Sequence, residues 1–247
     1  MSTVPAYRRR GSYGVDAPAQ IWILGGFVAV FLIAALVLGP LYFHVFAWYL
    51  LVLGLLMAIQ TAFYVYATRR GKFQVWDELL DALALTGDER LLDMGCGRGA
   101  VLLSAARRLP RGRAVGIDLW RTVDQSGNAE SMTAANAEAE GVADRVDLHT
   151  ADMTRLPFGD GEFDVVVSSL AIHNIKTPEL RAAAVREAVR VLRPGGRLLI
   201  ADIFKSREYE AVLADLGARD LTAHSLGWRM WWGGPWVATR SVSATAP

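Results

Sequence analysis

The chain has 247 residues, of which 53% are apolar, and its formal net charge is +1. This near-neutral charge gives no basic field of the kind that attracts nucleic acid. One cysteine, Cys96, excludes a disulfide within the chain, and four histidines leave little for a metal site. Residues 17–68 contain no charged side chain. This uneven distribution predicts a membrane segment joined to a globular domain and excludes a purely soluble protein.

Two apolar stretches, Gln20–Leu38 and Ala47–Ala67, are each long enough to cross a bilayer as a helix. Gly39-Pro40 breaks the helix between them, so we expect a helical hairpin with a short connector. Arginines at residues 8–10 precede the first stretch and Arg69-Arg70 follows the second, which predicts that both ends face the cytoplasm. Aromatic belts would consist of Trp22, Tyr64 and Tyr66 at one interface and Tyr42, Trp48 and Tyr49 at the other.

A cleaved signal peptide and a twin-arginine export signal are the alternatives to this hairpin. Both are disfavoured, because the apolar run exceeds the roughly 7–15 residues of a signal peptide and a second span follows. We therefore expect a cytoplasmic segment at residues 1–19, a transmembrane hairpin at 20–68 and a globular domain at 69–247. This organisation predicts a cell-membrane protein with two spans and a cytoplasmic domain.

After the hairpin, Gly71–Gly87 has the apolar spacing of an amphipathic helix that leads into the domain. Apolar strands then alternate with helical stretches, which predicts an α/β fold with a doubly wound, mostly parallel, seven-stranded sheet. One helix carries clear start signals, with Thr177 as N-cap and Pro178 at the first helical position. The predicted strands are Arg90–Met94, Ala114–Asp118, Arg145–His149, Phe163–Ser169, Arg197–Ile203, Arg219–Ser225 and Trp236–Val242. The predicted helices are Val101–Leu109, Ala129–Glu140, Glu179–Leu192 and Glu208–Leu216.

The sharpest motif is Leu91–Ala100 (LLDMGCGRGA), where a buried strand runs into a glycine-rich turn and the start of a helix. Gly95, Gly97 and Gly99 allow the backbone to turn tightly and to pass close to a ligand. The spacing also satisfies the looser dinucleotide fingerprint, and Asp118, about 20 positions on, suits a ribose in either case. This motif alone is therefore also compatible with a nicotinamide-dependent oxidoreductase, or with a glycine-rich turn that has only a structural role.

Further motifs follow in a fixed order. Asp152 comes after the third predicted strand, where a carboxylate can accept from the adenine amine while the Met153 backbone contacts the ring. Phe163–Asn174 (FDVVVSSLAIHN) covers the fourth strand and its exit loop, and Leu192–Asp202 (LRPGGRLLIAD) covers a helix end, a turn and the fifth strand. With these motifs in this order and spacing, residues from about Gly87 to Val242 resemble the class I S-adenosylmethionine-dependent methyltransferases.

The resemblance implies a Rossmann-like methyltransferase fold, in which Trp236–Val242 supplies the final antiparallel strand. It also implies S-adenosyl-L-methionine as the cofactor, with Asp93 and the glycines at its amino acid part, Asp118 at its ribose and Asp152 at its adenine. The membrane hairpin is not part of the common fold. The candidate cofactor-binding residues are Asp93, Gly95, Cys96, Gly97, Gly99, Asp118, Leu119, Asp152, Met153 and Ser168.

In an open sheet of this kind the methyl acceptor lies beyond the carboxyl ends of the strands. Ser168, Ser169, His173 and Asn174 leave the fourth predicted strand at that edge. His173 is the candidate catalytic base, because the reference pKa of histidine is about 6.5. The alternative is a loop histidine that is hydrogen-bonded to the backbone.

Two segments have an ambiguous role. In the loop Trp120–Asn128, turn-forming residues favour a polar surface loop, although Asp124, Gln125 and Asn128 could instead reach the cofactor or the acceptor. The run Leu226–Trp236 (LGWRMWWGGPW) holds four of the eight tryptophans. Core packing is favoured for any one of them, and an acceptor pocket or a membrane contact is the alternative.

The sequence thus predicts a membrane-anchored methyltransferase with a small, apolar or lipid-like acceptor, and with no metal and no nucleic-acid partner. One alternative is a nicotinamide-dependent oxidoreductase, against which stand Asp152, the LRPGG turn and the lack of a Tyr-x-x-x-Lys pair. The other is a membrane scaffold that binds the cofactor without turnover.

Overall fold

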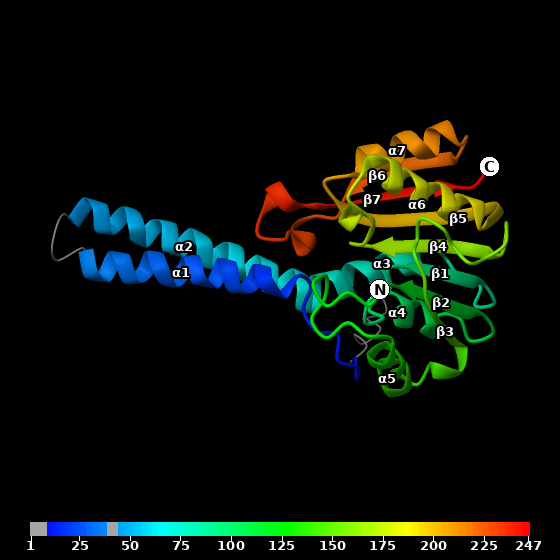
Figure 1. Ribbon diagram of the computed structural model, residues 1–247, viewed down its shortest axis with the longest axis horizontal. Coiled ribbons are helices and arrows are strands. Elements are labelled where there is room, and N and C mark those ends of the chain that lie inside the picture. Colours follow the sequence, from blue (N-terminus) through cyan, green and yellow to red (C-terminus); the bar gives the residue numbers. More distant parts are fainter. Residues whose placement is uncertain (1–8, 39–43) are drawn as a thin grey trace, which may run out of the picture.

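The computed structural model describes residues 9–38 and 44–247, and shows two long helices that project from an α/β domain (Figure 1). The helix break expected at Gly39-Pro40, the belt residue Tyr42 and Arg8 lie outside the described residues. By length and composition, two helices could cross a membrane, namely Pro18–Leu38 and the continuous helical path His44–Ala82.

Helices α1 (Pro18–Leu38) and α2 (His44–Tyr66) lie side by side along their length (Figure 1). Gly54 permits this close approach, because a Cβ at that position would lie 2.9 Å from the Leu32 side chain. Most of the apolar surface of the pair is exposed. The buried residues of the two helices are Leu24, Leu50, Gly54 and Tyr64.

The hairpin is joined to the domain without a break in the helix. A π-helical turn at Ala67–Gly71 connects α2 to α3 (Lys72–Ala82), which ends earlier than the predicted helix Gly71–Gly87. Gly71 is required here, because a Cβ at this position would lie 1.8 Å from the backbone oxygen of Arg229. The C-terminal loop therefore packs directly on the junction between the hairpin and the domain.

The seven-stranded sheet has the order β3-β2-β1-β4-β5-β7-β6. Strand β7 pairs antiparallel with both β5 and β6 and the other four pairs are parallel, so the predicted mostly parallel sheet with a final antiparallel strand is confirmed. The last strand begins three residues later than predicted, because Pro235–Val237 forms a 3-10 turn. The strands are β1 (Arg90–Met94), β2 (Arg113–Asp118), β3 (Val146–Thr150), β4 (Phe163–Ser169), β5 (Leu192–Ile203), β6 (Arg219–Ser225) and β7 (Thr239–Thr245).

Helices cover both faces of this sheet, as a doubly wound fold requires (Figure 1). Side chains of a strand alternate between the faces, so Leu91 packs with α3, α4 and α5, whereas Leu92 and Met94 pack with α6 and α7. Thr177 caps α6 as predicted, since its hydroxyl accepts from the Leu180 amide at 3.3 Å. The remaining helices are α4 (Leu102–Arg107), α5 (Glu130–Glu140), α6 (Pro178–Arg190) and α7 (Ser206–Asp215).

A third apolar cluster joins the base of the hairpin to the carboxyl ends of β4 and β5. Leu24 of α1 and Tyr64 of α2 are buried in it with Trp232, and Leu170 and Ile203 pack against it. Leu170 follows β4 directly, and Ile203 ends β5. The edge of the sheet at which ligands bind in open α/β folds therefore faces the hairpin.

The tryptophan-rich run packs on α2 rather than in the core of the domain. Trp228 stacks on Tyr66 at 5.1 Å between ring centroids, Trp231 lies 5.6 Å from Phe63, and Trp232 lies 5.4 Å from Tyr64. The expectation of core packing holds for Trp232, which is buried, but Trp228 and Trp236 are exposed. Tyr64, expected at a membrane interface, is instead buried beneath this run.

Candidate functional site

A pocket of about 840 Å³ lies at the carboxyl edge of the parallel strands. Its walls come from the turn after β1, the loops after β2, β3, β4 and β5, the start of α3 and the segment that enters α1. This volume falls within the range of small-molecule sites, roughly 300–1,000 Å³. The pocket lies where the sequence places both the cofactor and the acceptor.

Asp93 lies at the floor of the pocket and is 1% exposed. Neither of its carboxylate oxygens accepts a hydrogen bond from the residues that the structure describes. Burial raises the pKa of Asp93 to about 8, the nearby Leu102 amide acts in the opposite direction, and Asp118 adds to the rise. An unsatisfied buried carboxyl at the floor of a pocket is suited to a cationic ligand group.

The glycine turn above Asp93 brings the backbone to the pocket surface. Gly95 and Gly97 line the pocket at φ of 78° and 50°, and a Cβ on Gly95 would lie 2.3 Å from the Ala171 side chain. Cys96 also lines the wall, and burial raises the pKa of its thiol, so it stays neutral. Gly99 is needed for the turn, at φ 84°, but does not line the pocket.

Asp118 ends β2 and connects two pocket loops. Its Oδ2 accepts from the Gly97 amide at 2.8 Å, and its Oδ1 accepts from the Trp120 amide at 2.6 Å and the Asn128 side chain at 3.1 Å. A carboxylate offers about four acceptor positions, so capacity remains for a ligand hydroxyl. The predicted ribose residue is therefore in place and also organises the site.

The remaining predicted cofactor residues divide into two groups. Leu119, Asp152 and Met153 line the pocket, and one oxygen of Asp152 accepts from the Thr154 amide and hydroxyl, both at 2.8 Å. Ser168 does not line it: this residue is buried, and its hydroxyl donates to the Met94 carbonyl at 2.8 Å.

The loop after β2 is not a solvated surface loop, which corrects the favoured expectation. Gln125 and Asn128 are buried, Asp124 is partly buried, and all three line the pocket. Gln125 accepts from the Arg98 amide at 2.8 Å and donates to Asp16 at 3.1 Å. Burial also raises the pKa of Asp124, opposed by Arg121.

His173 lines the same pocket and has a carboxylate partner. Its Nδ1 lies 2.5 Å from Oδ1 of Asp202, and its backbone amide donates to the other oxygen at 3.0 Å. Tyr209 donates to the same carboxylate at 2.9 Å, and burial raises the pKa of this phenol, so that it keeps its proton. A carboxylate only accepts, so we assign Nδ1 as the donor to Asp202, which leaves Nε2 with its lone pair.

Three further pocket residues were not expected from the sequence. Lys72 forms an ion pair with Asp16, with 2.7 Å between Nζ and Oδ2, and Trp76 donates to the Ser169 hydroxyl at 2.8 Å. Asp16 is the last charged residue before the uncharged stretch, and Lys72 is one of the first after it. The opposite charges of these two residues, one on each side of the uncharged stretch, were the feature of the sequence that could have predicted this contact.

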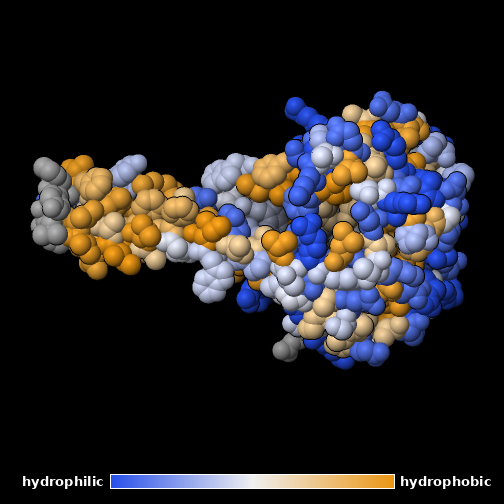
Figure 2. Space-filling model, viewed as in Figure 1, coloured by the Kyte–Doolittle hydropathy of each residue, from blue (hydrophilic) through white to orange (hydrophobic). Residues whose placement is uncertain are grey.

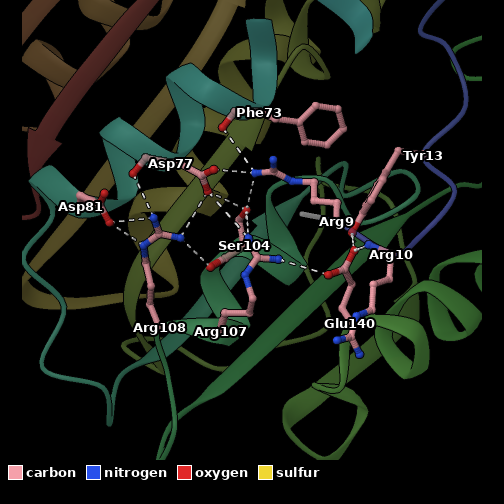
Figure 3. A network of polar contacts seen from close by, with 10 residues as sticks. All are labelled: Arg9, Arg10, Tyr13, Phe73, Asp77, Asp81, Ser104, Arg107, Arg108 and Glu140. Carbon is pink, nitrogen blue, oxygen red and sulfur yellow. Dashed lines mark hydrogen bonds and ion pairs between the residues drawn. The ribbon is translucent and has the colours of Figure 1, made fainter. Parts of the chain in front are cut away.

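The segment before α1 is held on the domain by a polar network (Figure 3). Arg9 pairs with Asp77 of α3 at 2.6 Å and lies 4.4 Å above the Phe73 ring. Farther along, Tyr13 donates to Glu140 of α5 at 2.7 Å. Residues 9–17 thus contact α3, α4 and α5 and end at the pocket wall.

Comparison with known proteins assigns this domain. A family model described as "Methyltransferase domain" matches residues 92–200. The ubiquinone/menaquinone biosynthesis C-methyltransferase UbiE of Roseobacter denitrificans is 36% identical over 133 residues, which are 53% of this chain and 50% of that protein. Residues 92–200 therefore form a methyltransferase domain, which is similar to those of class I S-adenosylmethionine-dependent methyltransferases. The resemblance found in the sequence is thereby confirmed.

Another relative of the methyltransferase domain is named for a different compound. The 27-O-demethylrifamycin SV methyltransferase of Amycolatopsis mediterranei is 36% identical over 128 residues, which are 51% of this chain and 43% of that protein. This chain spans about half the length of the curated relatives it matches.

Solved structures show the same fold at low sequence identity. A geranyl diphosphate methyltransferase in complex with S-adenosylmethionine has a TM-score of 0.57 and 18% identity, with 71% of this chain and 85% of that chain covered. The [4+2]-cyclase SpnF has a TM-score of 0.57 and 22% identity, with 69% and 81% covered. Because one of these neighbours is named a cyclase, the fold alone does not decide the reaction.

Proposed function

We propose that the protein is a membrane-anchored methyltransferase that uses S-adenosylmethionine to methylate a small apolar or lipid-soluble acceptor. The observation that carries this proposal is the unsatisfied, buried carboxyl of Asp93 at the floor of the pocket. Asp118 and Asp152 line the same pocket at the ends of the next two strands. When bound, the cofactor supplies a methyl group on a cationic sulfur.

The residues present fit that cofactor. Asp93 would face its ammonium group, Asp118 its ribose hydroxyls and Asp152 its adenine amine. Gly95 and Gly97 leave room for close approach, since side chains at these positions would collide with Ala171 and Gln125. The cofactor end of the pocket therefore has a polar partner for each part of the molecule.

His173 is suited to remove a proton from the acceptor. Its Nδ1 is held by Asp202, so Nε2 is free to accept within the pocket. Phe73, Trp76 and Trp232 line the side toward the hairpin, where their rings exclude water and contact an apolar acceptor. The residues of this chain thus contribute orientation, water exclusion and a base.

Two features support membrane anchoring. Only 6% of the apolar stretch of α1 and 11% of that of α2 is buried, whereas the core helix of a soluble domain would be mostly buried. The residues before α1 form part of the folded domain, through Arg9 with Asp77 and Asp16 with Lys72, which argues against a cleaved leader. The relatives named for ubiquinone and menaquinone biosynthesis support an acceptor that dissolves in lipid.

Replacement of Asp118 by alanine should weaken binding of S-adenosylmethionine by about 1.5–3 kcal/mol, the usual contribution of a hydrogen bond to a charged group. Titration calorimetry on the full chain in detergent measures this, because residues 16–20 contribute to the pocket and a shorter fragment would lack them. Asp147→Ala is the matched control, since that carboxylate pairs with Arg113 outside the pocket. Unchanged affinity in Asp118→Ala would refute the ribose assignment, and tighter binding of NADH by the wild-type chain would favour an oxidoreductase.

Both ends of the chain should face the cytoplasm, because exposed arginines flank the hairpin at Arg10 and at Arg69-Arg70. A reporter that is active only outside the cytoplasm should be silent when fused after Pro247. The same reporter inserted between Leu38 and His44 should be active. Activity after Pro247 would mean an odd number of spans or a cleaved leader, and would contradict the proposed topology.

A further inference from the structure

The exposed large apolar side chains of the domain gather at one end. Outside α1 and α2, the described residues include six large apolar side chains that are exposed. We call these six residues the apolar rim: Leu119, Val123, Leu180, Phe204, Trp228 and Trp236. Four of them line the pocket, and the two tryptophans belong to the loop that packs on α2.

This rim lies where the hairpin leaves the domain. The pocket that it borders is also lined by Gln20 of α1 and Tyr64 of α2. Ile203, which precedes Phe204, packs against the cluster at the base of the hairpin. Figure 2 shows the apolar hairpin and separate apolar patches on the adjoining end of the domain, whereas the opposite end is mainly hydrophilic.

The position of Phe204 is imposed by the fold. This residue is 67% exposed and has φ of 62°, a region that a bulky side chain rarely adopts. Strained backbone of this kind persists where the surrounding structure holds it and is concentrated at functional sites. An exposed phenylalanine held at the mouth of a pocket is therefore available to an apolar partner outside the described chain.

The exposed charged residues beside the apolar rim include basic ones, which an anionic lipid surface attracts. Arg121 and Lys176 line the pocket mouth and are exposed, and Arg69 and Arg70 are exposed at the base of α2. Basic side chains close to a bilayer are attracted by anionic head groups, and tryptophan is enriched at the same depth. The helical path from α2 to α3 has no flexible linker, so the domain is held at a fixed distance from the hairpin.

We propose that the apolar rim sits in the head-group region of the bilayer and that the pocket mouth opens into the membrane. The acceptor would enter sideways from the lipid, as an amphiphile with an apolar tail and a polar ring or head that reaches His173. This inference rests on the proposed membrane-anchored function and specifies the route and class of its acceptor.

Site-directed labelling tests the depth of the rim. Cys96 is buried and its pKa is raised, so a cysteine placed on the surface is the residue that reacts with a fluorescent maleimide. Phe204→Cys and Leu180→Cys report the rim, while Ala139→Cys and Ala214→Cys, exposed near the ends of α5 and α7, are the controls. The wild-type chain gives the background labelling.

The labelled full-length proteins are reconstituted in vesicles of phosphatidylcholine and phosphatidylglycerol that carry a nitroxide near the head group. We expect most of the emission to be lost at Phe204→Cys and Leu180→Cys and retained at both controls. Equal emission at all four positions in protein that floats with the vesicles would overturn the inference and leave the proposed function intact. Protein that does not float would overturn the anchoring as well, and binding of S-adenosylmethionine by each variant confirms that it is folded.

Discussion

Replacement of His173 by alanine should lower kcat by about 10²–10⁴ while the affinity for S-adenosylmethionine stays near normal. The reason is that His173 lines the pocket and Asp202 holds its Nδ1, so Nε2 is the nitrogen available as a base. The measurement is single-turnover methyl transfer across about pH 6–9, which brackets the reference histidine pKa of about 6.5. His149→Ala is the matched control, because that ring contacts Phe158 and lies outside the pocket.

The variant Asp202→Asn tests whether Asp202 orients the His173 ring or only stabilises the fold. An amide in place of the carboxylate can donate to Nδ1, which would move the ring proton to Nε2 and remove the base, so kcat should fall while KM changes little. Loss of S-adenosylmethionine binding together with activity would indicate a structural role for Asp202. An unchanged rate in His173→Ala at every pH would remove His173 from the mechanism and leave Asp124 or Asn174 as the next candidates.

Replacement of Asp93 by asparagine should weaken binding of S-adenosylmethionine by about 3–5 kcal/mol, the cost of removing one partner of a buried charge pair. That loss corresponds to an increase in Kd of more than about a hundredfold. The substitution keeps the shape of the side chain, so the effect reports the charge. Titration calorimetry measures it, and an unchanged Kd would refute the assignment of Asp93 to the ammonium group.

The pH dependence of stability gives an independent test of Asp93. Burial raises its pKa to about 8, while the pKa in the unfolded chain is about 3.9. Between these two pKa values the folded state therefore holds a proton on Asp93 that the unfolded state has lost. The contribution of this group to the free energy of unfolding is complete below about pH 4 and is lost as the pH rises through about 8. Thermal unfolding of the cofactor-free protein should show this decline, and Asp93→Asn should reduce it; an equal decline in both proteins would contradict the assignment.

Much of the fold could be predicted because its determinants are local. The strand β4 is an uninterrupted apolar run, and α6 begins with Thr177-Pro178, so both elements were located within one or two residues. The glycine turn after β1 likewise allowed the position of Asp93 at the pocket to be predicted. The last strand was displaced because Pro235 and the tryptophans before it form a compact loop on α2, and local propensity does not encode that packing.

The parts of the site that were missed depend on contacts between distant segments. Asp16 and Lys72 are 56 residues apart and meet because the hairpin returns the chain to its starting point. Ser168 and Ser169 are adjacent, but alternation along β4 buries the first and turns the second toward the pocket, which the sequence did not resolve. Asp202 is the last residue of the motif that covers the fifth predicted strand, and its pairing with His173 depends on the three-dimensional arrangement of β4 and β5.

The most direct test of membrane-anchored methyl transfer is to supply S-adenosylmethionine with a radiolabelled methyl group to membranes that contain the full-length protein. The reaction is then separated into lipid, aqueous and protein fractions, with membranes that carry Asp93→Asn as the control. The account predicts that label enters the lipid fraction with the wild-type chain and is lost with the variant. Label that stays in the cofactor, or that enters only the aqueous or protein fraction, would contradict a lipid-soluble methyl acceptor.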